Sequence, residues 1–154
     1  MLLAIILALS AAPVAALPAQ GLPTVPGVPN PQVTQANIGQ TICVSGWTKT
    51  VRPPASVTDK IKRQLMVSKH LPGVLSDYEL DHELSIEDGG SPDSLQNLWM
   101  QPYAGRYGAR VKDRIETKLK MLVCKGTITL DTARSALMTN WETAYEKYIG
   151  PIPQ

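Results

Sequence analysis

The chain has 154 residues and a formal net charge of +2, and a charge this small does not by itself identify a nucleic-acid-binding protein. After the two N-terminal segments described below, about 110 residues remain, which is enough for one domain and too few for two. The two cysteines form no Cys-x-x-Cys motif or Cys/His cluster, so a structural zinc site is not expected.

Residues 1–19 are predicted to be a signal peptide. The segment from Met1 to Ala16 carries no charged side chain, and its apolar run is shorter than the roughly 20 residues that span a bilayer. The segment lacks Lys and Arg before the apolar run, which is unusual, and an uncleaved anchor is the alternative. The prediction is a secreted, periplasmic or cell-envelope protein with no stable membrane insertion after cleavage.

Residues 20–40 contain recurring prolines among Gly, Val, Thr and Gln, without helical or strand periodicity. This composition predicts a disordered arm. A protein partner could bind the arm, although no aromatic or basic anchor accompanies the prolines. Residues 41–150 then form the folded domain. In an exported domain the two cysteines, Cys43 and Cys124, are expected to form a disulfide.

The domain is predicted to belong to the α+β class. Apolar residues at helical spacing (Val57, Ile61, Leu65) predict a helix over about 56–68, and His70 beyond its end is expected to be a surface residue. Alternating residues predict strands at about 77–84 and 97–101. Two more helices, about 108–124 and 131–149, are predicted from apolar stripes that end at glycines.

The residues that could carry chemistry lie on and between the two predicted strands. Asp81-His82 is followed by Asp88-Gly89-Gly90 and then by Asn97-Leu98-Trp99. The Asp81 carboxylate could hold a divalent metal, and His82 could accept a proton from an attacking water. Asn97 could bond the loop backbone and fix the direction of His82. The alternative for His82 is a core residue between Leu80 and Leu84.

This order of residues, with fifteen positions from His82 to Asn97, resembles the HNH endonuclease motif. Further segments along residues 42–148 resemble small exported bacterial proteins with an HNH-like core, namely Ile42-Cys43, Gly46-Trp47-Thr48, Val51-Arg52-Pro53-Pro54, Ala109-x-x-Lys112-Asp113-x-x-Glu116, Val123-Cys124 and Trp141-x-x-Ala144-Tyr145. The resemblance implies a ββα-metal core that hydrolyses phosphodiesters in DNA or RNA. It also implies His82 as general base, Asp81 as metal ligand and Asn97 as the residue that orients His82.

One part of the resemblance is incomplete. HNH enzymes commonly take another metal ligand, His or Asn, from the helix after the second strand, but here Gly108 stands at that place and no His follows His82. Three alternatives follow: Asp113 or Glu116 supplies a second carboxylate, water completes a weak metal shell, or catalysis is lost. Mg²⁺ is the metal expected first, because it keeps several waters, with Mn²⁺ and Zn²⁺ as alternatives.

Charge is arranged in blocks along the domain. Residues 49–69 carry six basic side chains and one acid, 77–93 carry seven acids and no Lys or Arg, and 106–125 carry seven basic side chains and two acids. An acidic centre attracts a cation, while basic flanks attract phosphates, and Arg110 and Lys112 are candidate substrate contacts. The alternative for Lys112 is a solvated ion pair with Glu116 four residues away.

Two functions are therefore predicted, and they belong to different classes. The first is an exported, metal-dependent nuclease of the HNH type, in which activity is weakened or lost if the metal site is incomplete. The second is a secreted binding protein that retains the ββα scaffold without catalysis. The direction of Asp113 and Glu116 distinguishes them, because a carboxylate that faces Asp81 favours the enzyme.

Overall fold

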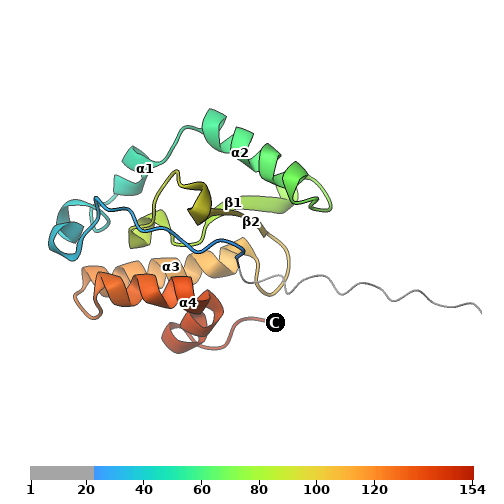
Figure 1. Ribbon diagram of the computed structural model, residues 1–154. Coiled ribbons are helices and arrows are strands. Elements are labelled where there is room, and N and C mark those ends of the chain that lie inside the picture. Colours follow the sequence, from blue (N-terminus) through green and yellow to red (C-terminus); the bar gives the residue numbers. More distant parts are fainter. Residues whose placement is uncertain (1–22) are drawn as a thin grey trace, which may run out of the picture.

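A computed structural model describes residues 23–154, so the predicted signal peptide lies outside the described residues. The domain combines helices with one two-stranded antiparallel sheet, which confirms the α+β class (Figure 1). The helices and strands, in chain order, are α1 (Trp47–Val51), α2 (Ala55–Ser68), β1 (Tyr78–His82), β2 (Leu98–Pro102), α3 (Ala109–Cys124) and α4 (Leu130–Tyr148). Within residues 23–154, no helix is both long and apolar enough to cross a membrane.

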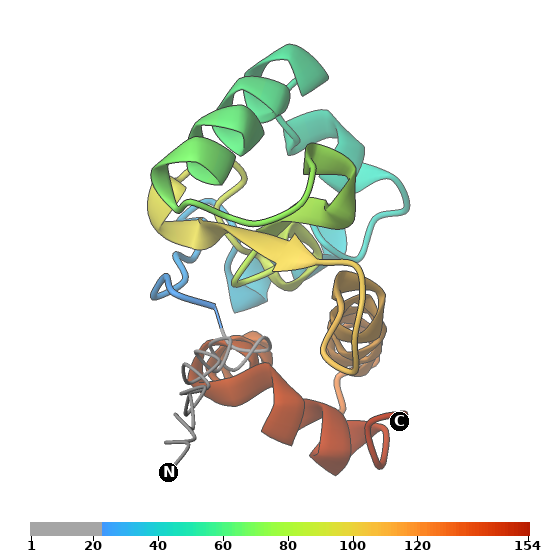
Figure 2. The same ribbon diagram turned by 90° about the vertical axis from the view of Figure 1, so that its right-hand side faces the viewer.

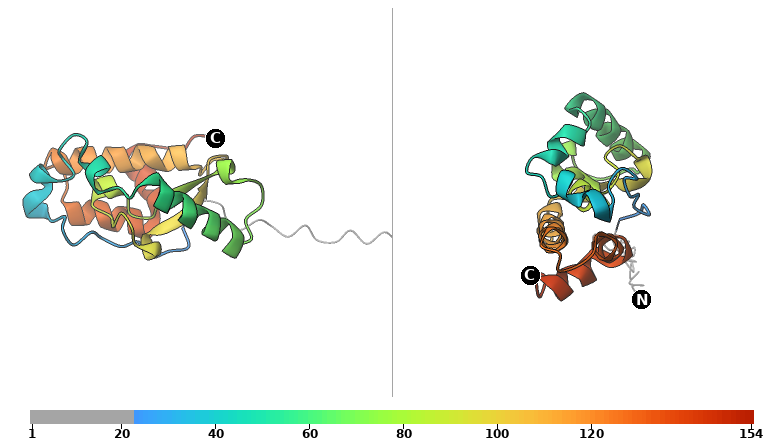
Figure 3. Two further views of the ribbon diagram at one scale, coloured as in Figure 1. Left: turned by 90° about the horizontal axis from the view of Figure 1, so that it is seen from above. Right: turned by 90° about the vertical axis from the view of Figure 1, so that its left-hand side faces the viewer.

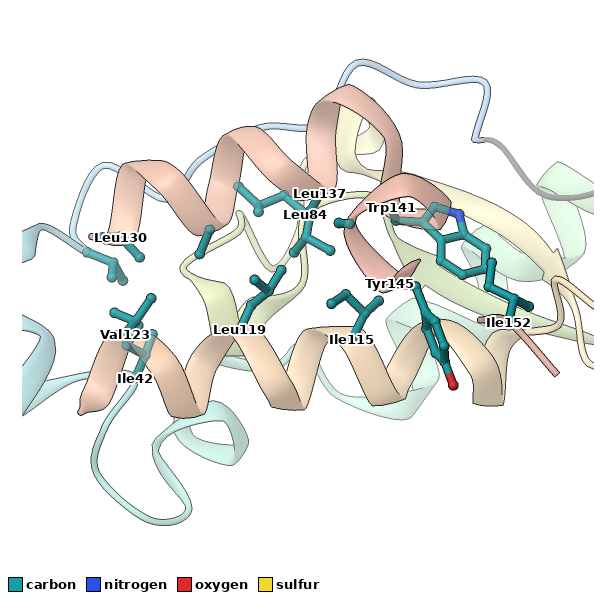
Figure 4. Packing of buried hydrophobic residues seen from close by; sticks show 13 residues of the cluster. Ile42, Leu84, Ile115, Leu119, Val123, Leu130, Leu137, Trp141, Tyr145 and Ile152 are labelled. Atoms are coloured by element: carbon teal, nitrogen blue, oxygen red, sulfur yellow. The ribbon is translucent and has the colours of Figure 1, made fainter. Parts of the chain in front are cut away.

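The main hydrophobic core lies between α3 and α4, which run side by side (Figure 3). The predicted apolar stripe of α3 is buried at Ile115, Leu119 and Val123, and it faces Leu137 and Trp141 of α4 (Figure 4). Burial of one such side chain contributes about 1.5–3 kcal/mol to stability. Because this face of α3 is fixed against α4, the opposite face of the helix is directed at β1.

The sheet lies between α2 and α3 (Figure 2). Strand β1 pairs with β2, and Asp81 lies opposite Trp99 while His82 lies opposite Leu98. The alternating sequence predicted one buried face, yet Asp81 and His82 are both buried, with exposed fractions of 7% and 6%. The difference arises because both faces of the sheet are covered at this end, so both side chains are enclosed.

Residues 28–40 belong to the folded domain, where the composition predicted a disordered arm. The Asn30 amide donates to the Gly89 carbonyl (2.8 Å), and Pro29 forms a bridge with Gly90. Val33 is part of the hydrophobic core, with an exposed fraction of 1%. This segment runs along the edge of the domain opposite α3 (Figure 3). It therefore covers the loop that joins the two strands.

The predicted disulfide between Cys43 and Cys124 is confirmed, with the two Cα atoms 5.6 Å apart. The bridge joins the segment before α1 to the last residue of α3 across 81 positions of sequence. In the chain-entropy account a loop of this length contributes about 4 kcal/mol. The disulfide thus holds the start of the domain against the helix that faces the sheet.

The helix predictions agree with the structure to within about two residues, and two features were not predicted. Helix α1 is a single short turn before α2. Helix α4 is kinked at Asn140, whose φ of −172° and ψ of 103° are extended rather than helical. Beyond the kink, Trp141 and Tyr145 are both buried, and they lie toward the N-terminal part of α3 (Figure 4).

Candidate functional site

Asn97 holds together the loop between the two strands. Its Oδ1 accepts hydrogen bonds from the amides of Leu84 (2.9 Å) and Val28 (3.1 Å), and its Nδ2 donates to the carbonyls of Leu84 (2.9 Å) and Ser91 (2.8 Å). The side chain is fully buried. The backbone bonds that the sequence suggested for Asn97 are therefore present, and a substrate cannot reach this amide.

Two glycines shape the same loop. Gly89 has a φ of +79°, in the left-handed region that glycine adopts without steric cost. A Cβ at Gly90 would collide with the Leu84 carbonyl, while the Gly90 amide donates to the Ser85 carbonyl (2.8 Å). Gly89 is thus required by its left-handed backbone, and Gly90 by the close approach of two backbone segments in the loop that follows β1.

His82 is held by this loop in one tautomer. Its Nε2 lies 3.1 Å from the carbonyl oxygen of Pro92, beside Ser91. A carbonyl only accepts, so Nε2 carries the proton in the neutral ring and Nδ1 keeps the lone pair. Burial lowers the pKa of His82 below its usual range. The ring is therefore neutral at pH 7 and can accept a proton at Nδ1.

Lys112 lies beneath Asp81 and His82, and it is completely buried. Its Nζ donates to Oδ2 of Asp81 (2.9 Å), to the backbone carbonyl of His82 (2.7 Å) and to Oε1 of Glu116. Burial alone would lower the pKa of this ammonium, but the two carboxylates raise it above its usual range. All three N–H groups have acceptors, and the side chain remains charged.

The position of Lys112 corrects two predictions. The pair formed by Lys112 and Glu116 is buried rather than solvated, because the polar face of α3 lies against β1. Lys112 also cannot contact a substrate, since no part of it is exposed. Arg110, the other candidate substrate contact, is exposed and stacks over the Tyr103 ring at 5.8 Å from the centroid. Arg110 does not line the pocket that contains His82.

A pocket of about 240 Å³ opens above this cluster. Its polar lining includes Arg52, Glu79, Asp81, His82, Asp113 and Glu116. Residues from β1 and α3 that are about 30 positions apart in sequence therefore meet in one place. Burial and the neighbouring Asp81 and Asp113 carboxylates raise the pKa of Glu79 to about 7. The pocket thus combines a neutral imidazole, a carboxyl group that titrates near neutrality and several negative charges.

The donor set fits the predicted metal site only in part. Within residues 23–154, no three His, Cys, Asp or Glu side chains are gathered closely enough to hold a metal ion. The pair of Asp81 and Glu116 does not fit a metal, because the Lys112 ammonium already lies between the two carboxylates. Asp81, whose Oδ1 is not bonded to Lys112, and the exposed Asp113 both line the pocket. Burial and Asp81 raise the pKa of Asp113.

Gly108, which stands where the HNH resemblance expects a ligand, has a steric role. It is the buried residue directly before α3, and a Cβ there would collide with the carbonyl oxygen of Tyr103. Asn or His at this position would therefore require the backbone around Tyr103 to move. The structure accounts in this way for the missing ligand.

Two residues of the pocket were assigned no role from the sequence. Arg52 follows α1 and places an exposed cation among the carboxylates. Its charge partly opposes the rise in the pKa of Glu79 that burial causes, and it adds to the lowering of the pKa of His82 by burial. Glu79 alternates with Leu80 on β1 and looked like a solvent-facing strand residue. No local sequence pattern distinguishes either residue, because the approach of α1 to β1 depends on the tertiary fold.

Comparisons with protein-family models, curated proteins and solved structures found no match to this chain.

Proposed function

We propose that the chain is an exported phosphodiesterase of the HNH type that acts on DNA or RNA. The observation that supports this most directly is the single pocket that contains Asp81, His82 and the α3 carboxylates Asp113 and Glu116. The order β1, β2 and α3, with α3 in contact with β1, agrees with the ββα arrangement that the resemblance implies. The disulfide fits an oxidising compartment and therefore supports export.

His82 acts in this proposal as the general base. Its Nε2–H is engaged with Pro92, so the Nδ1 lone pair would take the proton from the attacking water. The lowered pKa of His82 keeps this lone pair available at neutral pH. Asn97 supports the base indirectly, because it fixes the backbone of Ser91 beside Pro92.

Arg52 and Glu79 supply the other two requirements of phosphodiester hydrolysis. The Arg52 guanidinium is the exposed cation of the pocket and would bind the phosphate. Glu79, with a pKa of about 7, retains a proton in a large fraction of molecules at neutral pH and would donate it to the leaving oxygen. A base and an acid that line one pocket support this proposal, because acid–base catalysis requires both.

A divalent cation, Mg²⁺ first with Mn²⁺ or Zn²⁺ as alternatives, remains part of the proposal. Such an ion would stabilise the negative charge that develops on the phosphate. The residues available to hold it are Asp81, through the oxygen not bonded to Lys112, and Asp113. So few protein ligands suit Mg²⁺, which keeps much of its water.

The test is cleavage of plasmid DNA and of RNA by the purified protein with Mg²⁺, Mn²⁺, Zn²⁺ or EDTA. His82→Ala should lower the rate by about 10²–10⁴-fold, because general-base assistance is lost. His70→Ala is the matched control, since His70 is the chain's other histidine and is exposed at the end of α2. The wild-type rate should fall only at pH values more acidic than the usual imidazole pKa of 6.5, because burial lowers the pKa at which His82 gains a proton. Unchanged cleavage by His82→Ala would overturn the assignment.

The second candidate is a secreted binding protein without catalysis, acting on nucleic acid or on a protein partner. It is favoured by one observation, the neutralisation of Asp81 by Lys112 where an HNH enzyme needs a metal ligand. The same assay separates the two candidates. Retention of labelled DNA or RNA without cleavage under any of the metals would support the binding protein.

A further inference from the structure

Three oxygen atoms surround the Lys112 ammonium, and they come from two elements of the fold. Oδ2 of Asp81 and the carbonyl oxygen of His82 belong to β1, and Oε1 of Glu116 comes from the next turn of α3. Two carboxylates and a backbone carbonyl form a donor set typical of calcium sites. The oxygen cage therefore has the composition of a metal site, but its cation is an ammonium group.

This cage differs from an ordinary ion pair within a helix. Such a pair is solvated, and water and side-chain entropy leave it little net effect on stability. Lys112 is instead wholly buried, and one of its acceptors is a main-chain carbonyl of another element. The ammonium is delivered by α3, whose opposite face is fixed by the packing of Ile115 and Leu119 near α4.

We propose that the oxygens of Asp81, His82 and Glu116 form a cation site that Lys112 fills permanently in place of a metal ion. Lys112 is therefore a positioning residue that holds the Asp81 side chain and the His82 backbone. It leaves only one carboxylate oxygen of Asp81 available to the pocket. The cage holds its cation whether or not the protein cleaves phosphodiesters, so stability rather than activity is the readout.

Removal of the ammonium should convert the cage into a divalent-metal site. Lys112→Ala leaves both carboxylates and the carbonyl in place and opens space between them. Ca²⁺ is the main probe, because its usual bonds to oxygen, about 2.3–2.6 Å, require only a small contraction of the cage. Mn²⁺ is the second probe. The matched control is Lys120→Ala, which removes a partly exposed lysine from the same helix.

Thermal unfolding at pH 8 should give the following pattern. In EDTA, Lys112→Ala should lower Tm by on the order of 10 °C, because two buried carboxylates lose their counter-ion. Millimolar Ca²⁺ should restore at least half of that loss, with one ion bound per chain by native mass spectrometry. The wild type and Lys120→Ala, in which the ammonium still fills the cage, should be stabilised by either ion less than Lys112→Ala is. The double variant Lys112→Ala/Glu116→Ala should lose the response, because one ligand is gone.

If Lys112→Ala does not fold in EDTA, folding on addition of Ca²⁺ or Mn²⁺, followed by circular dichroism, gives the same readout. The proposal is overturned if neither ion stabilises Lys112→Ala more than it stabilises the wild type and Lys120→Ala. It is also overturned if Lys112→Ala is as stable in EDTA as the wild type. Absence of nuclease activity in the wild type would leave these outcomes unchanged and would count only against the proposed function.

Discussion

Two buried aspartates, Asp81 and Asp88, lie seven residues apart, and their carboxyl groups have different hydrogen-bond partners. Asp81 accepts a hydrogen bond from the Lys112 ammonium. Asp88 is fully buried, but its carboxylate accepts only from Ser85 (2.6 Å from Oγ to Oδ2), and its Oδ1 has no partner among the described residues. Burial raises the pKa of Asp88 to about 8. Asp88 is therefore largely neutral at pH 7, whereas the Asp81 region contains a buried cation.

The two ends of the loop differ in whether the buried carboxyl group has a cation as its hydrogen-bond partner. Helix α3 places Lys112 at the Asp81 end, and Arg134 of α4 lies at the Asp88 end, where its Nε donates to the Asp88 backbone carbonyl (3.4 Å). Nη2 of Arg134 donates hydrogen bonds to the backbone carbonyls of Gly89 and Val33 (2.9 Å each) rather than to the Asp88 carboxylate. Charge is thus compensated only where the pocket opens, and the Asp88 end is a neutral, buried support for the loop.

The largest loss of stability should follow from removal of the Lys112 ammonium at the Asp81 end. Lys112→Met leaves two carboxylates buried without a cation, which should destabilise the domain by about 3–5 kcal/mol in urea unfolding at pH 7. Adding Asp81→Asn and Glu116→Gln to this variant should recover a large part of the loss, because no buried charge then remains. A triple variant that is no more stable than Lys112→Met would contradict the importance of charge at this end.

Asn97→Ala should have the next largest effect, because Asn97 connects both ends of the loop. Four hydrogen bonds to the backbone are lost, and the expected cost is about 2–4 kcal/mol. Hydrogen exchange should accelerate in residues 85–96. Gln96→Ala is the control, since Gln96 is exposed. Unchanged exchange in the loop of Asn97→Ala would count against a supporting role.

The helices and the disulfide could be predicted from sequence because their signals are local. Apolar spacing marks α2, α3 and α4, and two cysteines in a chain predicted to be exported allow one pairing. The Asp81–His82 pair and Asn97 were marked as candidates in the same way, because their spacing resembles that of the HNH motif. These signals describe short segments and require no knowledge of how the segments pack.

The surroundings of the site could not be predicted, because they depend on packing. The spacing of Lys112 and Glu116 is equally typical of a solvent-facing pair, and only the contact of α3 with β1 buries it. Arg52 reaches the pocket only because α1 ends beside β1. Val33 is an isolated apolar residue among prolines and polar residues, with no periodic partner that would have marked it as core.

The raised pKa of Asp88 makes the stability of the domain depend on pH. The pKa of Asp88 in the folded protein, about 8, is above the usual value of 3.8. Between about pH 4 and pH 8 the folded state therefore keeps a proton that the unfolded chain has already released. Stability from this group is complete below pH 4 and falls as pH rises, by up to about 1.4 kcal/mol per pH unit. Glu79 and Glu83, with pKa values of about 7, act in the same direction.

Asp88→Asn should therefore flatten the decrease in stability between pH 5 and pH 8, measured by urea unfolding, without removing it entirely. The control Asp59→Asn changes an exposed aspartate of α2 and should leave the pH profile unchanged. If the wild type became more stable as pH rose over this range, Asp88 would be charged in the folded protein and the two ends of the loop would be alike.

The smallest effect should come from the ion pair of Lys120 and Glu87. This pair is partly exposed, so it can be compared with the buried pairs of Lys112. The charged atoms of Lys120 and Glu87 are 3.4 Å apart, and both side chains are partly exposed, at 29% and 24%. Water and salt screen such a pair, so Lys120→Met should change the free energy of unfolding by less than about 1 kcal/mol, and less still at 1 M NaCl. A cost comparable to that of Lys112→Met would mean that burial does not distinguish the two lysines. The charged cage beneath Asp81 would then be an ordinary ion pair of α3.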